Sequence, residues 1–278
     1  MHFYAETLGL SDSAFSILRD LIHERTGNYY DEAKRDLLAS KLSGLVLERG
    51  FTSFLEYYYL LRYDPAGEQE WPRLLDALSV PETFFWREPA ALEALAQHLV
   101  PAWAAQHSGP LRIWSAGCAT GEEPISIAIA LREAGWLGRI PIQILATDAS
   151  ARALDVARRG IYRERSFRSM PPQFRERYFT PAEDGWQPMP EIAQHIQWSL
   201  VNLVAEEQVA RCAPAPIIFC RNVFLYFSPQ AIRATVERFS EHMPQPAYLF
   251  LGVAESILRL TTRFQLQEIG GAFVYVKQ

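Results

Sequence analysis

Acidic residues follow a turn of small residues near the middle of the chain. An apolar run at 111–114 leads into the residues SAGCATG, then into Glu122, Glu123 and Pro124, and then into a helix-like apolar stretch at 125–131. This pattern predicts a strand, a tight turn and a helix, because small residues let the backbone approach a ligand and proline is favoured in a first helical turn. Open α/β sheets bind their ligands at such turns, beyond the carboxyl end of a strand.

A further acid, Asp148, closes the next apolar run, at 142–147. A carboxylate at the end of the second strand of a βαβ unit can accept hydrogen bonds from both ribose hydroxyls of a nucleoside. The turn lacks the GxGxxG fingerprint of dinucleotide sites, and Glu122 and Glu123 would repel a pyrophosphate. We therefore predict a nucleoside ligand that carries a cationic group. S-adenosylmethionine (SAM), with its sulfonium and its α-ammonium, fits this description.

Composition excludes several other classes of protein. The chain has 278 residues, 49% of them hydrophobic, and a net charge of −5, which argues against nucleic-acid binding through a broad basic surface. No apolar run reaches the roughly 18 residues of a membrane span, and the first ten residues lack a signal-peptide pattern. Its cysteines, Cys118, Cys212 and Cys220, show no CxxC spacing. We expect a cytoplasmic protein with no metal site, no nucleic-acid partner and no membrane insertion.

The order of the patterns predicts two domains. Residues 1–80 form an all-helical N-terminal domain, because apolar residues recur at helical spacing from position 11 onward. Residues 81–95 form a linker that contributes to the ligand site, and residues 96–278 form an α/β domain built on a parallel sheet. Within this domain, residues 163–198 are rich in proline and less regular.

Two predicted strand pairings complete the α/β domain. Residues 177–179 and 196–198 are expected to pair as a small antiparallel excursion from the main sheet. Residues 264–266 and 272–276 are expected to form a closing hairpin around two adjacent glycines.

The linker contains three adjacent aromatic residues in the sequence PETFFWRE, at 81–88. One interpretation is a hydrophobic plug between domains. The other is that Thr83 and Arg87 reach into the ligand site, where an arginine can align a carboxylate by paired hydrogen bonds. A second polar pair, Arg221 and Asn222, follows a buried strand at 215–220 and so lies where an open sheet binds its ligand.

Four stretches together resemble the CheR family, the chemotaxis receptor glutamate O-methyltransferases. In chain order they are PETFFWRE, IWSAGCATGEEPISIAI, LATDAS and IIFCRNVFLYF. The resemblance implies an all-α N-terminal domain and a Rossmann-like SAM methyltransferase domain with a small inserted antiparallel β subdomain, for which 163–198 is the candidate. It also implies methyl transfer from SAM to glutamates on the cytoplasmic helical bundle of a chemoreceptor. The products would be glutamyl methyl esters, which serve sensory adaptation, and S-adenosylhomocysteine (SAH). We expect the enzyme to be a monomer.

The resemblance also implies the site residues. Glu122 matches a contact near the methionine part of SAM, Asp148 the ribose-binding acid, and Asn202 and Leu203 the contacts around adenine. The full set that matches the family's cofactor contacts is Thr83, Arg87, Ala116, Glu122, Asp148, Asn202, Leu203, Arg221 and Asn222. Tyr226 matches a tyrosine near the transferring methyl. We predict that Arg87 and Tyr226 orient the acceptor and that no general base is needed.

The sequence departs from the family pattern at three places. Pro81 stands where the family has asparagine, which removes one polar contact. The segment at 179–191 is shorter than in members that grip a pentapeptide tether, so we expect a pentapeptide-independent enzyme. The second helix keeps only part of the family's basic receptor-facing surface, namely Lys34, Arg35, Lys41 and Arg49.

Other interpretations of the residues stay open at this stage. Glu123 can be only a first-turn helix acid, Tyr226 a core residue and Asp148 a helix N-cap. The whole chain can be a non-catalytic SAM-binding signalling module, a nucleotide-dependent dehydrogenase, or a methyltransferase for another protein or a small molecule.

Overall fold

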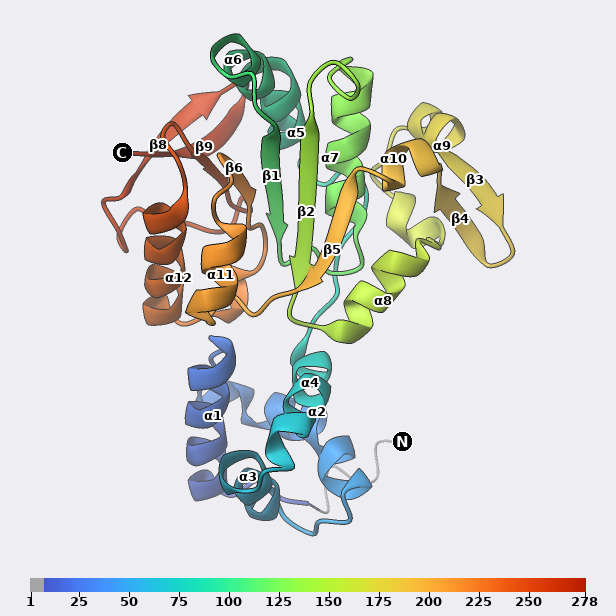
Figure 1. The fold of residues 1–278 in the computed structure, drawn as a ribbon. Coiled ribbons are helices and arrows are strands. Elements are labelled where there is room, and N and C mark those ends of the chain that lie inside the picture. Colours follow the sequence, from blue (N-terminus) through green and yellow to red (C-terminus); the bar gives the residue numbers. More distant parts are fainter. Residues whose placement is uncertain (1–7) are drawn as a thin grey trace. The chain divides into compact units, whose positions relative to one another are not determined.

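A computed structural model describes residues 8–278, which divide into two units (Figure 1). The first unit holds the chain up to Val80 together with the short segment Tyr226–Ile232. The second unit holds Pro81–Leu225 and Arg233–Gln278. Residues 1–7 of the predicted helical domain lie outside the described residues.

The first unit consists of helices packed around one apolar core. Ser11 caps the first helix through its Oγ, which accepts from the Ala14 amide. The helices are α1 (Asp12–Thr26), a 3₁₀ turn (Glu32–Lys34), α2 (Arg35–Glu48), α3 (Phe54–Tyr63) and α4 (Gly67–Leu78). Fully buried side chains from all four α-helices meet in the core, among them Phe15, Leu18, Ile22, Leu38, Leu42, Val46, Tyr57 and Leu74.

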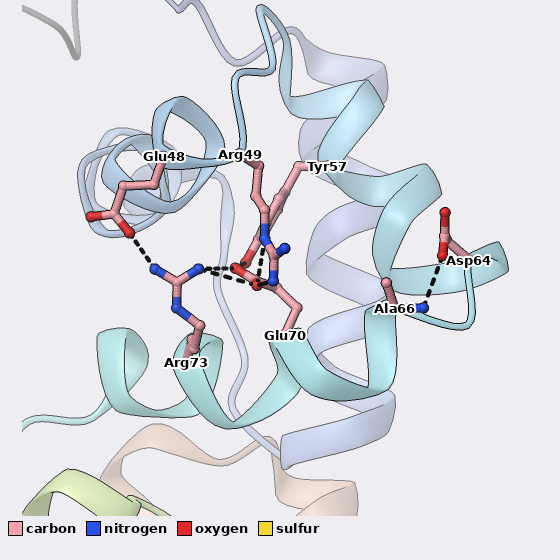
Figure 2. Close-up of polar contacts among 7 residues, drawn as sticks. All are labelled: Glu48, Arg49, Tyr57, Asp64, Ala66, Glu70 and Arg73. Atoms are coloured by element: carbon pink, nitrogen blue, oxygen red, sulfur yellow. Dashed lines mark hydrogen bonds and ion pairs between the residues drawn. The ribbon is translucent and has the colours of Figure 1, made fainter.

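A buried carboxylate links three of these helices (Figure 2). Glu70 of α4 is 0% exposed and accepts from the Tyr57 hydroxyl at 3.1 Å, from Arg49 Nε at 2.9 Å and from Arg73 Nη1 at 3.3 Å. Arg73 also pairs with Glu48. A buried charge is costly unless it is paired, and here two arginines pair with one carboxylate.

The segment Tyr226–Ile232 belongs to this unit through backbone contacts with the loop after α1. The Tyr29 amide donates to the Tyr226 carbonyl at 2.8 Å, and the Ser228 amide donates to the Gly27 carbonyl at 3.2 Å. Gly27 has φ +78°, and a Cβ there would lie 2.8 Å from the Phe227 ring. Glycine is therefore required at this position both by the backbone angle and by the packing.

The second unit is built on a seven-stranded sheet in the order β5-β2-β1-β6-β7-β9-β8 (Figure 1). Neighbouring strands are parallel from β5 to β7, while β9 runs antiparallel to both β7 and β8. The chain fills one half of the sheet from β1 to β5 and then returns to β6 beside β1. The order thus reverses between β1 and β6, which is where open α/β sheets bind ligands.

The bounds of these strands match most of the predicted apolar runs. They are β1 (Leu111–Ala116), β2 (Ile142–Asp148), β5 (Ile196–Leu200), β6 (Ile217–Phe219), β7 (Tyr248–Phe250), β8 (Phe264–Ile269) and β9 (Ala272–Lys277). The predicted closing hairpin is confirmed as β8 and β9.

Helices connect the strands and alternate with them along the chain. They are α5 (Pro89–Ala94), a π-helical turn (Leu95–Leu99), α6 (Val100–Gln106), α7 (Glu122–Glu133), α8 (Ala151–Arg159), a 3₁₀ turn (Glu164–Phe167), α9 (Pro172–Tyr178), α10 (Pro190–Ala193), α11 (Glu206–Cys212), a 3₁₀ turn (Phe224–Tyr226) and α12 (Pro229–His242). Ser150 caps α8 by accepting from the Ala153 amide at 3.0 Å.

The small antiparallel sheet forms from different residues than expected. The predicted pairing of 177–179 with 196–198 is wrong, because β3 (Phe179–Ala182) pairs with β4 (Gly185–Pro188). Residues 196–200 instead form β5, which extends the main sheet parallel to β2. The two residues between β3 and β4 allow a tight hairpin, and a local hairpin closes more readily than a pairing across a longer loop.

Candidate functional site

Four neighbouring parallel strands place most of the predicted site residues at one edge of the sheet. Ala116 ends β1 and Asp148 ends β2, while Asn202 and Leu203 follow β5, and Arg221 and Asn222 follow β6. Because these strands run in the same direction, their carboxyl ends share an edge, and the reversal of strand order lies at its centre. The assignment of these residues to cofactor binding stays a prediction.

The turn after β1 is fixed to the end of β2 by backbone hydrogen bonds. The amides of Gly117 and Cys118 donate to the Thr147 carbonyl at 2.8 and 2.9 Å. The Ala119 amide donates to Asp148 Oδ2 at 2.9 Å, and the Ser150 amide donates to Oδ1 at 2.8 Å. The carboxylate of Asp148 is thus oriented by the backbone of both βα turns and does not itself cap α8.

Gly121 makes the close approach of this turn to its neighbours possible. Its φ is +99°, and a Cβ would lie 2.7 Å from the Trp198 ring and 2.9 Å from the Tyr162 hydroxyl. The small residues of the turn were predicted to admit a ligand. At this position the glycine also admits two aromatic side chains of the protein.

Glu122 is a buried carboxylate without an arginine or lysine partner. It is 3% exposed, and it accepts from Thr120 Oγ1 at 2.7 Å and from Ser166 Oγ at 2.9 Å. Burial raises its pKa, while the two hydroxyl groups act in the opposite direction. Within residues 8–278 no ion pair is made by its carboxylate, and the charge of Arg168 acts on it only as the weakest of the influences that lower its pKa.

Glu123, by contrast, is paired inside the protein. It accepts from Ser115 Oγ at 2.7 Å and from Arg221 Nη1 at 3.0 Å. The side chain of Arg221 is 2% exposed, and its Nη2 also contacts Glu88 at 3.0 Å and the Arg87 carbonyl at 2.8 Å. Glu123 is therefore more than a first-turn helix acid.

The aromatic segment 81–88 is anchored in the second unit. Phe85 is fully buried, with its ring centroid 4.8 Å from that of Tyr162 and 4.9 Å from that of Phe167. Its amide donates to the Ser166 carbonyl at 2.8 Å. Phe85 thus acts as a buried hydrophobic anchor, and the polar residues Thr83 and Arg87 belong to the same segment.

Thr83 and Arg87 remain half-buried on either side of this anchor. Arg87 Nη1 donates to the Glu82 carbonyl at 3.2 Å, and its guanidinium lies 5.3 Å from the Phe84 ring centroid. These contacts are compatible with a guanidinium that also receives an acceptor carboxylate, because an arginine has five N–H donors.

A half-buried acid that the sequence patterns did not reveal, Glu255, holds Asn222. Glu255 Oε2 accepts from the amides of Asn222 and Gly252, each at 2.7 Å. Burial raises the pKa of Glu255, and the backbone donors act against this shift. Asn222 has φ +61°, a conformation that such contacts stabilise. The sequence signal that could have identified Glu255 is its position, five residues after the buried strand β7.

The remaining predicted residues are placed as follows. The Asn202 amide donates to Gln208 Oε1 at 2.8 Å, its Oδ1 accepts from the Val204 amide at 3.2 Å, and Leu203 is buried. Tyr226 belongs to the first unit and is 41% exposed, so it is not a core residue.

Neither a metal centre nor a membrane span emerges from the described part of the chain. Residues 8–278 contain no group of three or more metal-ligating side chains. Over the same range, no helix combines the length and the apolar character needed to traverse a bilayer. The three cysteines are buried, and burial raises the pKa of each thiol.

Comparison with protein families accounts for both parts of the chain. A model described as the CheR methyltransferase all-alpha domain matches residues 13–79, and one described as the CheR methyltransferase SAM binding domain matches residues 81–272. The chain belongs to the CheR methyltransferase family. The predicted resemblance and the predicted fold class are thereby confirmed.

Relatives of this CheR protein cover nearly its whole length. The chemotaxis protein methyltransferase 2 of Vibrio cholerae serotype O1 is 32% identical over 272 residues, which are 96% of this chain and 94% of that protein. The chemotaxis protein methyltransferase of Escherichia coli K12 is 34% identical over 268 residues, 94% of this chain and 91% of that protein. The family and these relatives support SAM-dependent methylation in chemotaxis by this CheR protein.

Proposed function

We propose that this CheR methyltransferase transfers the methyl group of SAM to glutamate side chains on the cytoplasmic helical bundle of a chemoreceptor. The products are glutamyl methyl esters, used in sensory adaptation, and SAH. The observation that carries the proposal is Glu122, a buried carboxylate at this edge of the sheet that makes no ion pair with the described residues, so that an added positive charge beside it is favourable. A cationic nucleoside supplies that charge, whereas a pyrophosphate would oppose it.

Each part of the cofactor has a counterpart along the sheet edge. Glu122 binds the α-ammonium of the methionine part, and Asp148 binds the ribose hydroxyls. Asn202 and Leu203 contact the adenine, while Thr83, Ala116, Asn222 and the backbone of Arg221 complete the surroundings. The fit rests on the order of these residues along β5, β2, β1 and β6, and on the charge of the two acids.

The chemistry requires alignment more than acid–base assistance. Bound SAM supplies a methyl group already activated by the sulfonium, and a carboxylate oxygen of the acceptor displaces SAH from it. The acceptor glutamate is ionised at neutral pH, so no residue has to remove a proton. Arg87 orients this carboxylate by paired hydrogen bonds, and Tyr226 assists. Holding the reacting atoms in line is the principal contribution of the protein.

The proposal extends to the oligomeric state of the enzyme, its location and its use of a tether. The enzyme acts as a monomer in the cytoplasm, where the receptor bundle lies. The β3–β4 hairpin, with two residues between its strands, supports recognition without a pentapeptide tether.

The decisive experiment combines isotopically labelled SAM with a receptor fragment and locates the label by mass spectrometry. We expect the label on glutamates only, and an Arg87→Ala variant should lose most of the rate while an exposed control, Arg158→Gln, keeps it. SAH binding without transfer to any fragment would favour the non-catalytic module. Label on another protein, or on glutamine, would contradict the proposed reaction.

A further inference from the structure

Arg87 lies between two residues with left-handed backbone conformations. Trp86 has φ +62° and Glu88 has φ +54°. Side chains with a Cβ seldom adopt these angles, and such residues persist where surrounding contacts hold them and cluster at functional sites. The backbone that carries Arg87 is therefore held in place by other parts of the second unit.

The contacts that hold it come from two directions. The Trp86 amide donates to Ser126 Oγ of α7 at 3.0 Å. From the end of β6, Arg221 Nη2 donates to the Arg87 carbonyl at 2.8 Å and contacts Glu88 at 3.0 Å. The other terminal nitrogen of Arg221 contacts Glu123 of α7 at 3.0 Å.

The contacts of Arg221 depend on the planar, forked shape of its side chain. A planar guanidinium can direct two nitrogens to partners on different elements at once, whereas an ammonium is a single compact charge on a flexible stem. The Arg221 side chain is 2% exposed, and its two partner carboxylates, Glu88 and Glu123, are 22% and 15% exposed. The three protein contacts occupy both terminal nitrogens of this buried guanidinium, while its Nε has no hydrogen-bond partner among the described residues.

We propose that Arg221 is a positioning residue, which bridges Glu123 to the backbone of Arg87 and Glu88 and so fixes Arg87 for alignment of the acceptor carboxylate. Its side chain acts on the reaction through Arg87 and does not contact SAM. The inference rests on the proposed role of Arg87 in methyl transfer.

The test compares Arg221→Lys and the milder Glu88→Gln with the wild type and with the exposed control Arg158→Gln. The kcat and KM for methylation of the receptor fragment are measured together with SAH affinity by calorimetry. We expect Arg221→Lys to lower kcat at least tenfold and to change the Kd of SAH less than threefold. Glu88→Gln should lower kcat severalfold. An unchanged kcat, or a parallel loss of SAH affinity, overturns the proposal.

A second measurement does not depend on activity. Hydrogen exchange of the backbone amides at 84–88 should accelerate at least tenfold in Arg221→Lys, with exchange in β1 and β2 unchanged. Unchanged exchange at 84–88 overturns the proposal whether or not the protein methylates receptors. If the wild type transfers no methyl group while exchange responds as expected, the proposed function fails and the bracing of this backbone segment by Arg221 stands.

Discussion

The two units each bury a glutamate, and they treat it in opposite ways. In the first unit Glu70 is fully buried and contacts two arginines and a tyrosine hydroxyl (Figure 2). In the second unit Glu122 is 3% exposed, and its carboxylate accepts from two side-chain hydroxyl groups. The first carboxylate is neutralised within the fold and joins helices. The second makes no ion pair within the described residues, and burial raises its pKa.

The largest effect is expected from removing the arginines around Glu70. Arg49→Met with Arg73→Met leaves a buried charge without a cationic partner, and we expect the free energy of unfolding to fall by about 3–5 kcal/mol. Urea denaturation measures this loss. Adding Glu70→Leu to the pair should restore most of the stability, because replacing a whole buried ionic group by apolar side chains is often neutral. If the triple variant is no more stable than the double, the charge is not the cause.

In the second unit the same kind of substitution should act on binding and not on folding. Glu122→Gln keeps the shape and removes the charge, so we expect SAH affinity to fall at least tenfold, equivalent to about 1.4 kcal/mol. The free energy of unfolding of the ligand-free protein should stay the same or rise, because a buried charge is removed. Calorimetry and urea denaturation separate the two quantities. A large loss of stability with unchanged SAH affinity would mean that Glu122, like Glu70, serves folding and not binding.

The pH dependence of binding sharpens the contrast further. Because burial raises the pKa of Glu122 above 4.5, protonation begins at a higher pH than for a free glutamate. We expect SAH affinity to decrease as the pH falls through this raised pKa, and the Glu122→Gln variant to lack this component. Calorimetry over a pH series tests it.

Stability of the ligand-free protein should change in the reverse sense. A raised folded-state pKa means that the folded form binds the proton more tightly than the unfolded form. The contribution of Glu122 to the free energy of unfolding is then fully present below the unfolded-state pKa and is lost as the pH rises through the folded-state pKa. Comparing wild type with Glu122→Gln isolates this component, and identical pH profiles of the two proteins would speak against it.

The smallest effect concerns the capping of α3 in the first unit. Ser53 Oγ accepts from the Glu56 amide at 3.3 Å. Ser53→Ala should therefore lower the free energy of unfolding by about 1 kcal/mol. SAH affinity should be unaffected, and a change in calorimetry beyond twofold would show that this helix end influences the cofactor site.

Sequence patterns predict correctly which candidate residues lie at the ends of the parallel strands. Asp148 directly follows one apolar run, and Glu122 follows the turn of small residues after another. Parallel strands bring their carboxyl ends to the same edge of the sheet. The interactions of Arg221 could not be predicted, because its contacts Glu88 and Glu123 lie far away in sequence and are set by the packed geometry. Glu255 follows a buried parallel strand in the sequence, but its contact with the Asn222 amide is likewise set by the packed geometry.

Strand partners are harder to predict than strands. Residues 196–198 have a strand-like composition in either role, and only the neighbouring β2 decides that they join the main sheet. The assignment of Tyr226–Ile232 to the helical unit likewise has no local signal. It depends on Gly27, whose missing side chain leaves room for Phe227.

The interleaving of this segment with the helical unit has a practical consequence for dissecting the molecule. An expression clone that stops at Val80 would deprive the loop at Gly27–Tyr29 of the strand-like neighbour that satisfies its amide and carbonyl groups. Such a fragment would expose the apolar surface that the Phe227 ring covers in the intact protein. Its failure to bind a receptor would therefore say little about the intact enzyme. Separating the two halves cleanly calls for a grafted copy of residues 226–232, not for a single cut.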